Sequence, residues 1–190
     1  MKIIAIVGMC GSGKSTVSDM LVKKGYQYIR LGQITLDKVK EQGLSPTEEN
    51  ERPIRQNLRD KYGMAAYAIL NFSKIDDLLK KGNVVADDLY SWEELSEFKK
   101  RYGKNFSTLC MMASPNIRYE RLTGRELDEK KDVDIKFRPM TKEEAMSRDN
   151  FDIENLNKAG PIAMADYTIL NEGTIEDLEI NFERFVKSFL

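Results

Sequence analysis

A stretch of eight residues near the N-terminus has the residue types and the spacing of a loop that binds phosphate groups. Residues 8–15 fit the pattern G-x-x-x-x-G-K-[ST], and its glycines let the backbone curl until several N–H groups face one anion. Lys14 is placed to reach the β- and γ-phosphates of a nucleoside triphosphate, and the Ser15 hydroxyl is placed to bind Mg²⁺. The candidate ATP-binding residues of this segment are Gly8, Met9, Cys10, Gly11, Ser12, Gly13, Lys14, Ser15 and Thr16.

The residues on either side of this loop support the same interpretation. An apolar run over residues 2–7 predicts a strand, and the spacing of Val17 and Leu21 predicts a helix that begins near Lys14. The N-terminus of such a helix carries about half a positive charge, which favours a bound anion. A chance glycine-rich turn is the alternative, and the agreement of strand, loop and helix disfavours it. Cys10 is interpreted as a small residue that fits the loop, since nothing else in the sequence marks a nucleophile.

Two aspartates at the end of another apolar run predict a second part of the site. Residues 84–86 are typical of a buried strand, and Asp87 and Asp88 follow directly. A carboxylate at this place can hold a water molecule of the Mg²⁺ shell. Asp87 is the favoured metal-binding and catalytic candidate because it comes immediately after the strand, and Asp88 is the alternative.

An arginine-rich segment follows the predicted strand over residues 106–112. On a helix, Arg118, Arg121 and Arg125 fall at positions i, i+3 and i+7 and therefore share one face. Arginine forks are suited to the charge that spreads over phosphoryl oxygens in the transition state of phosphoryl transfer. Arg121 and Arg125 are thus catalytic candidates, and the alternative is a solvated face whose arginines pair with neighbouring glutamates.

Together with the sequence Asp166-Tyr-Thr-Ile-Leu-Asn-Glu-Gly173, these motifs resemble small phosphate-loop kinases of the nucleoside-monophosphate kinase type. Among them the chain looks most like dephospho-CoA kinases and a group of archaeal relatives. The resemblance implies a three-layer α/β fold with a five-stranded parallel sheet in the order 2-3-1-4-5. It also implies a lid over residues 114–150, and it places Asn171 and Gly173 beside the adenine. An ordinary strand-to-helix turn is the alternative for the last motif.

The acceptor side departs from that family. Related kinases often carry an aspartate after the second strand, where this chain has Gln33, which cannot act as a base. Asp37, one helical turn later, is the candidate for this role. Arg30, at the end of the second strand, and Arg55 and Arg59, on one face of a predicted helix, are candidates for binding an acceptor phosphate. A solvated helix face is the alternative for the last two.

The elements that position these residues alternate along the chain, as in an α/β fold with a mainly parallel sheet. We expect one domain over residues 1–190, with a helical excursion covering the acceptor over about 33–80. Helical spacing predicts a long segment from Thr47 toward Lys81 that is broken near Gly63, and an apolar stripe over residues 175–189. The predicted strands are 2–7, 26–30, 83–86, 106–112 and 167–170.

The composition excludes several classes of function. The chain has no histidine, which rules out Ser-His-Asp catalysis and zinc sites built on histidine, and its two cysteines cannot form a disulfide framework. Thirty basic and 31 acidic residues give a net charge of −1, so nucleic acid is not the expected main partner. No apolar run is long enough for a signal peptide or a membrane span, and we expect a cytoplasmic protein. Residues 157–160, Asn-Lys-Ala-Gly, lack the aspartate that a GTPase needs to recognise guanine.

The expected function is transfer of the γ-phosphoryl group of ATP, with Mg²⁺, to a small nucleotide-like acceptor such as dephospho-CoA or a nucleoside monophosphate. The alternative is a phosphate-loop ATPase that acts as a regulatory or partner-binding switch. Turnover of ATP that does not depend on an acceptor would distinguish this alternative.

Overall fold

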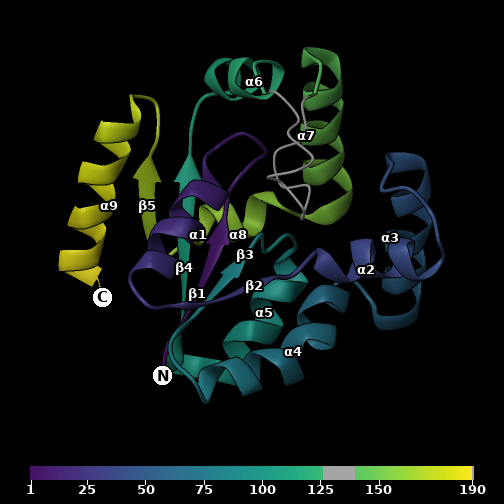
Figure 1. Cartoon of the computed structure of the whole chain (residues 1–190), viewed down its shortest axis with the longest axis horizontal. Helices are drawn as coiled ribbons and strands as arrows, with labels where there is room; N and C mark the ends of the chain where they lie inside the picture. Colours follow the sequence, from purple (N-terminus) through teal and green to yellow (C-terminus); the bar gives the residue numbers. More distant parts are fainter. Residues whose placement is uncertain (126–139, 190) are drawn as a thin grey trace.

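A five-stranded parallel sheet forms the centre of the molecule, in the order β2-β3-β1-β4-β5 (Figure 1). The computed structural model describes residues 1–125 and 140–189. All four strand pairs are parallel, and this confirms the predicted order. Each strand begins and ends within one residue of its predicted limits: β1 (Ile3–Val7), β2 (Gln27–Arg30), β3 (Val84–Asp87), β4 (Phe106–Met112) and β5 (Tyr167–Leu170).

Helices cover both faces of this sheet and produce three layers (Figure 1). All five residues of β1 are buried, because alternate side chains pack against opposite helical layers. Ile4 and Ile6 face the layer of α1 (Lys14–Lys23) and α9 (Ile175–Phe189), whereas Ile3, Ala5 and Val7 face the layer of α4 (Ala66–Leu79) and α5 (Trp92–Tyr102).

The apolar stripe predicted over residues 175–189 lies on α9, and only part of it is buried against the sheet. Leu178, Phe182 and Phe185 are buried against it, but Ile175 at the start of the helix is exposed. Thr174 caps this helix by accepting a hydrogen bond from the N–H of Asp177 at 3.3 Å.

The segment expected to cover the acceptor forms two helices that extend to one side of the sheet and one that packs on it. These are α2 (Gln33–Glu41), α3 (Glu48–Tyr62) and α4. Thr47 caps α3 through its side chain, and Gly63 ends it at a φ of 76°, which confirms the predicted break. All three helices contribute to the buried core that includes β2 and β3, through Val39 of α2, Ile54 and Leu58 of α3 and Ile75 of α4.

The helices above the carboxyl ends of the strands are α6 (Pro115–Thr123) and α7 (Lys142–Leu156), and the short α8 (Ala159–Ala163) leads into β5 (Figure 1). Thr141 and Glu144 form a reciprocal capping box that starts α7. The lid predicted over residues 114–150 therefore contains α6 and most of α7, and its residues 126–139 lie outside the described residues.

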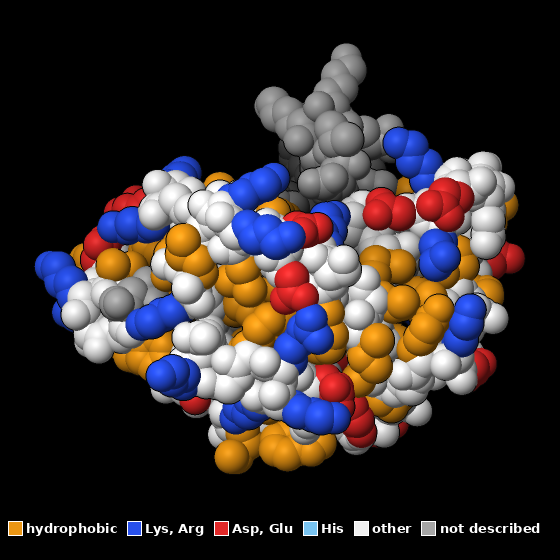
Figure 2. Space-filling view, turned by 90° about the horizontal axis from the view of Figure 1, so that it is seen from below, with side chains coloured by type: hydrophobic (Ala, Val, Ile, Leu, Met, Phe, Trp, Pro, Cys, Tyr) orange, Lys and Arg blue, Asp and Glu red, His pale blue; other side chains and the backbone are white. Residues whose placement is uncertain are grey.

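Charged side chains of both signs are interspersed over the face shown in Figure 2, with apolar side chains between them. This agrees with the small net charge of the chain. Among the helices within residues 1–125 and 140–189, none is both long enough and apolar enough to cross a membrane.

Candidate functional site

The glycine-rich loop connects β1 to α1 at the carboxyl edge of the sheet, and both α6 and the turn after β5 pack against it. Gly11 has a φ of 79°, and a Cβ atom there would lie 2.7 Å from the carbonyl oxygen of Arg118 in α6. Gly13 has a φ of 99°, and a Cβ atom there would collide with the side-chain amide of Asn171, which follows β5. Only glycine fits these two positions, because each combines left-handed backbone with a close neighbour. No side chain of the described residues caps α1, which leaves its N-terminus able to face an anion.

Lys14 bends back over the loop that precedes it. Its Nζ donates hydrogen bonds to the carbonyl oxygens of Gly8, at 3.0 Å, and Met9, at 3.1 Å. The same Nζ lies 3.4 Å from Oδ1 of Asp88. The lysine expected to contact phosphates is thus held next to the carboxyl end of β3.

Asp88 adopts an unusual backbone conformation at this place. Its φ of 70° is left-handed, which is uncommon for a residue with a side chain and is often found at functional sites. Burial opposes ionisation of the carboxyl group, but the cations of Lys14 and Lys158 outweigh burial and hold the pKa of Asp88 well below its usual range. Asp88 is therefore an ionised, partly buried carboxylate beside the phosphate-binding loop.

Asp87, the favoured metal-binding candidate, is also buried. Oδ2 of Asp87 accepts a hydrogen bond from the hydroxyl of Tyr28 at 3.0 Å. Burial and the adjacent Asp88 carboxylate raise the pKa of Asp87. Oδ1 of Asp87 and Oδ1 of Asp88 accept no hydrogen bond from the described residues. Two buried carboxylate oxygens with open acceptor positions fit Mg²⁺, which is commonly held through one or two carboxylates and bound waters.

A cluster of charged residues from α7 and the α7–α8 turn completes this side of the site, and the sequence did not indicate the burial of Lys158 or its pairing with Asp152. Lys158 is buried, and its Nζ lies 2.9 Å from Oδ2 of Asp152 and 3.9 Å from the centre of the Tyr90 ring. Arg148 donates a hydrogen bond to the Tyr90 hydroxyl at 3.2 Å. Lys158 was considered only as part of a guanine-binding motif, and nothing in its local sequence indicates burial.

The arginines of α6 do not share one functional face, which corrects the prediction from their spacing. Arg118 is buried and donates to the carbonyl oxygens of Ala113 and Cys10, and it forms an ion pair with Asp149 at 2.6 Å. Its guanidinium group links α6 and α7 to the glycine-rich loop. Arg125 lies beyond the end of α6, because Gly124 is the C-cap, so the i+7 argument was wrong for this residue.

Arg121 points instead to the turn between β5 and α9. It donates to the carbonyl oxygens of Asn171, at 2.9 Å, and Gly173, at 3.3 Å. The side-chain amide of Asn171 donates to the carbonyl oxygen of Ser12 at 2.9 Å. The two residues expected beside the adenine are thus connected to α6 by Arg121, and the Asn171 side chain connects their turn to the loop.

The acceptor candidates lie on β2, α2 and α3. Arg30 pairs with Asp87 in the register of β2 and β3, which places it at the carboxyl edge. Gln33 donates to Asp37 at 3.1 Å on the exposed side of α2. Arg55 forms an ion pair with Glu51 at 3.0 Å. The guanidinium group of Arg59 lies over the ring of Tyr67, 5.5 Å from its centre. Arg59 therefore faces α4.

Glu94 is a buried acid near the same helices. Its carboxylate accepts hydrogen bonds from the N–H groups of Tyr90, at 2.8 Å, and Ser91, at 3.4 Å, as part of the capping box of α5. Burial raises the pKa of Glu94 to about 7, and these hydrogen bonds compensate only in part.

Replacing Glu94 by glutamine should stabilise the protein at pH 8 and leave its stability unchanged near pH 4. The folded-state pKa of about 7 lies above the ordinary value of 4.5, so the wild-type protein loses stability as the pH rises between these values. Since one pKa unit corresponds to about 1.4 kcal/mol, the Glu94→Gln variant should gain about 3 kcal/mol at pH 8. Urea unfolding of both proteins at pH 4, 6 and 8 measures this difference. Glu97→Gln, on the more exposed side of α5, is the control, and an equal response of the two variants would contradict the assignment.

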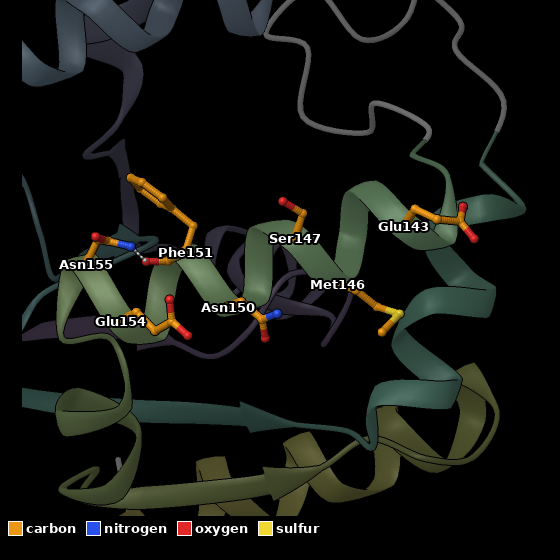
Figure 3. Close-up of a pocket in the computed structure, with 7 residues that line it drawn as sticks. All are labelled: Glu143, Met146, Ser147, Asn150, Phe151, Glu154 and Asn155. Carbon is orange, nitrogen blue, oxygen red and sulfur yellow. Dashed lines mark hydrogen bonds between the residues drawn. The ribbon is translucent and has the colours of Figure 1, made fainter.

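A shallow groove of about 530 Å³ runs along the exposed side of α7, away from the glycine-rich loop (Figure 3). All its lining residues belong to α7. Figure 3 shows the Phe151 ring and the Met146 side chain extending from this helix, and the side-chain amide of Asn155 bonded to the carbonyl oxygen of Phe151. The groove contains none of the candidate residues for nucleotide binding.

Comparison with known proteins identifies the family. A family model described as AAA domain matches residues 4–155. Along its whole length the chain is 34% identical to a UPF0200 protein from Sulfurisphaera tokodaii and covers 98% of that protein. The chain is an AAA-domain protein of the UPF0200 family. The dephospho-CoA kinase specificity that the sequence resemblance implied is not shown by these relatives, which carry only the UPF0200 name.

Solved structures share the fold of this UPF0200 protein. TT1252 from Thermus thermophilus has a TM-score of 0.63 at 19% identity, with 100% of this chain and 98% of that chain covered. A shikimate kinase from Aquifex aeolicus has a TM-score of 0.52 at 23% identity, with 97% and 94% covered. The chain therefore shares its fold with these two proteins, one of which is a shikimate kinase.

Proposed function

We propose that this chain is an ATP-dependent kinase that transfers the γ-phosphoryl group to a small nucleotide-like acceptor, acting as one domain over residues 1–190. The observation that carries the proposal is the approach of Lys14, at the end of the glycine-rich loop, to the partly buried Asp88, which follows the buried Asp87 at the end of β3. A cation for the phosphates and carboxylates for a divalent metal are the two parts that phosphoryl transfer needs close together.

The residues of the loop bind the donor in this proposal. The backbone from Gly8 to Gly13 and the N-terminus of α1 surround the phosphates, and Lys14 turns from the carbonyl oxygens of Gly8 and Met9 toward them. Ser15, together with Asp87 or Asp88, would hold Mg²⁺. When bound, Mg²⁺ would neutralise part of the charge that develops on the β- and γ-phosphate oxygens.

The remaining candidates lie around the donor and the acceptor. Asn171 and Gly173 border the base of the nucleotide, and Arg121 orients their turn. To contact a phosphate itself, Arg121 would have to leave the two carbonyl oxygens that it now binds. Arg30, Arg55 and Arg59 are proposed to bind the anionic part of the acceptor, with Asp37 orienting its reactive group. The shikimate kinase among the structural neighbours supports a small-molecule acceptor as a class.

A screen for acceptor-dependent transfer tests this function. The protein is incubated with ATP and Mg²⁺ and with each nucleoside monophosphate or dephospho-CoA in turn, and formation of ADP and of the phosphorylated product is measured. We expect at least one acceptor to raise ADP formation well above the rate without acceptor. ATP turnover that stays the same with every acceptor would contradict the proposal.

That contrary outcome would favour an ATPase that acts as a regulatory or partner-binding switch. One observation favours this second function. Gln33 occupies the position of the expected acceptor base, and its amide group is bonded to Asp37. Asp37 itself is on α2 at the surface, so the proposed base is only weakly enclosed in this structure.

A further inference from the structure

One carboxylate oxygen at the end of β3 is shared by two ammonium groups. Oδ1 of Asp88 lies 3.4 Å from Nζ of Lys14 and 4.0 Å from Nζ of Lys158. The two lysines are far apart in the sequence, since one is the first residue of α1 and the other lies in the turn before α8. Asp88 therefore has two lysine counter-ions, with Arg148 as a further cation nearby, and the closer lysine is the one that a nucleotide would attract.

Lys158 is held in place by a set of contacts that does not involve the loop. Its side chain is 2% exposed, its Nζ is bonded to Asp152 at 2.9 Å, and the Tyr90 ring lies beneath it at 3.9 Å. A buried lysine needs such partners, because burying a charge without a partner is strongly unfavourable. The same contacts keep a positive charge beside Asp88 whether or not Lys14 is there.

Lys14, by contrast, has partners that a nucleotide would replace. It is bonded to two carbonyl oxygens of its own loop and is paired with Asp88. Moving its ammonium group toward β- and γ-phosphates separates it from Asp88, whose side chain is partly buried. When Mg²⁺ is held on Asp87 and no other cation is near Asp88, this movement would leave the Asp88 carboxylate unpaired and would oppose binding of the nucleotide.

We propose that Lys158 is a positioning residue that takes over as the counter-ion of Asp88 when Lys14 moves to the phosphates, and thereby makes binding of the nucleotide favourable. The inference rests on the proposed binding of ATP by the glycine-rich loop. It adds an exchange of ion pairs, in which Asp88 changes partner from Lys14 to Lys158 and no proton or bond is transferred.

The first test is nucleotide affinity in a variant that removes Lys158 without leaving Asp152 unpaired. Lys158→Met combined with Asp152→Asn keeps the local charge balance and the approximate side-chain volumes. We expect the Kd for ATP with Mg²⁺, measured by calorimetry, to rise at least tenfold, while kcat at saturating ATP changes by less than about threefold. A Kd equal to that of the wild-type protein would overturn the inference. The control is Lys24→Met with Glu183→Gln, a surface ion pair of 2.7 Å between α1 and α9.

A double-mutant cycle separates this role from a purely structural one. With Asp88→Asn there is no carboxylate to neutralise, so adding the Lys158→Met and Asp152→Asn changes should alter the Kd by less than about threefold. A structural role of Lys158 predicts the same loss of affinity in both backgrounds. That result, like an unchanged Kd, would overturn the proposal.

A structure of the wild-type protein with an ATP analogue and Mg²⁺ gives an answer even where the variants do not fold. We expect Lys14 to contact phosphate oxygens and the distance from Nζ of Lys158 to Oδ1 of Asp88 to shorten from 4.0 Å to that of a direct ion pair. A longer distance between Nζ of Lys158 and Oδ1 of Asp88 in the complex would contradict the exchange of ion pairs. Wild-type protein that binds no ATP would instead contradict the proposed function, so the two failures are distinguishable.

Discussion

Lys14→Ala is expected to reduce phosphoryl transfer by about a hundredfold to a thousandfold and to leave the protein folded. The ammonium group of Lys14 bends over the loop that would hold the phosphates, and removing one group that stabilises developing charge in a preorganised site costs about two to three orders of magnitude. Because Lys158 remains beside Asp88, the carboxylate keeps a counter-ion in the variant. ADP formation and thermal unfolding, measured side by side, check both halves of this expectation.

The matched control is Lys24→Ala, which changes an exposed lysine at the end of α1 that pairs with Glu183. It should retain activity and stability close to the wild-type values, because exposed ion pairs contribute little. A Lys14→Ala variant with full activity would remove the glycine-rich loop from the proposed mechanism.

Arg118→Leu is expected to have the largest effect on stability. Arg118 and Asp149 form an ion pair between side chains that are 5% and 6% exposed. Losing one member of a buried pair leaves the other charge uncompensated and costs about 3–5 kcal/mol. For a chain of this length that corresponds to a fall of about 10 °C in Tm. The variant also loses the hydrogen bond from Arg118 to the carbonyl oxygen of Cys10, so its affinity for ATP should fall as well.

Replacing both members of the pair by leucine shows whether Arg118→Leu loses stability because a charge is left unpaired or because the side chains pack poorly. The Arg118→Leu, Asp149→Leu protein should recover at least about 1 kcal/mol relative to Arg118→Leu alone, because no buried charge remains. Arg184→Leu on the exposed side of α9, where Arg184 bonds only to Asn181 among the contacts of the described residues, should change stability by less than about 0.5 kcal/mol. A double variant less stable than Arg118→Leu would show that the loss comes from packing.

The sequence was sufficient to predict the sheet because its central strands β1, β3 and β4 are largely buried on both faces. Such strands consist of short apolar runs such as Ile3–Val7, which are recognisable without knowledge of their neighbours. The loop at residues 8–15 was recognisable for a similar reason, since its glycines and Lys14 are required within one contiguous stretch. Thr47 marked the start of a helix that the structure confirms.

What the sequence could not supply were pairings between distant segments. The spacing of Arg118, Arg121 and Arg125 suggested one face, but Arg118 turns to Asp149 and Arg121 turns to Asn171. Local periodicity places residues on a helix, whereas the partner of each side chain depends on how that helix packs. The burial of Lys158 beside Asp88 has the same origin, because 70 residues separate the two along the chain.

The left-handed backbone of Asp88 has a consequence for attempts to make the protein more robust. Glycine is the residue that adopts this conformation without strain, so an engineer guided by melting temperature alone would choose Asp88→Gly. That choice would relax the main chain while deleting the acidic group on which both lysines converge. A higher melting temperature therefore favours glycine at position 88, whereas the proposed catalysis requires aspartate.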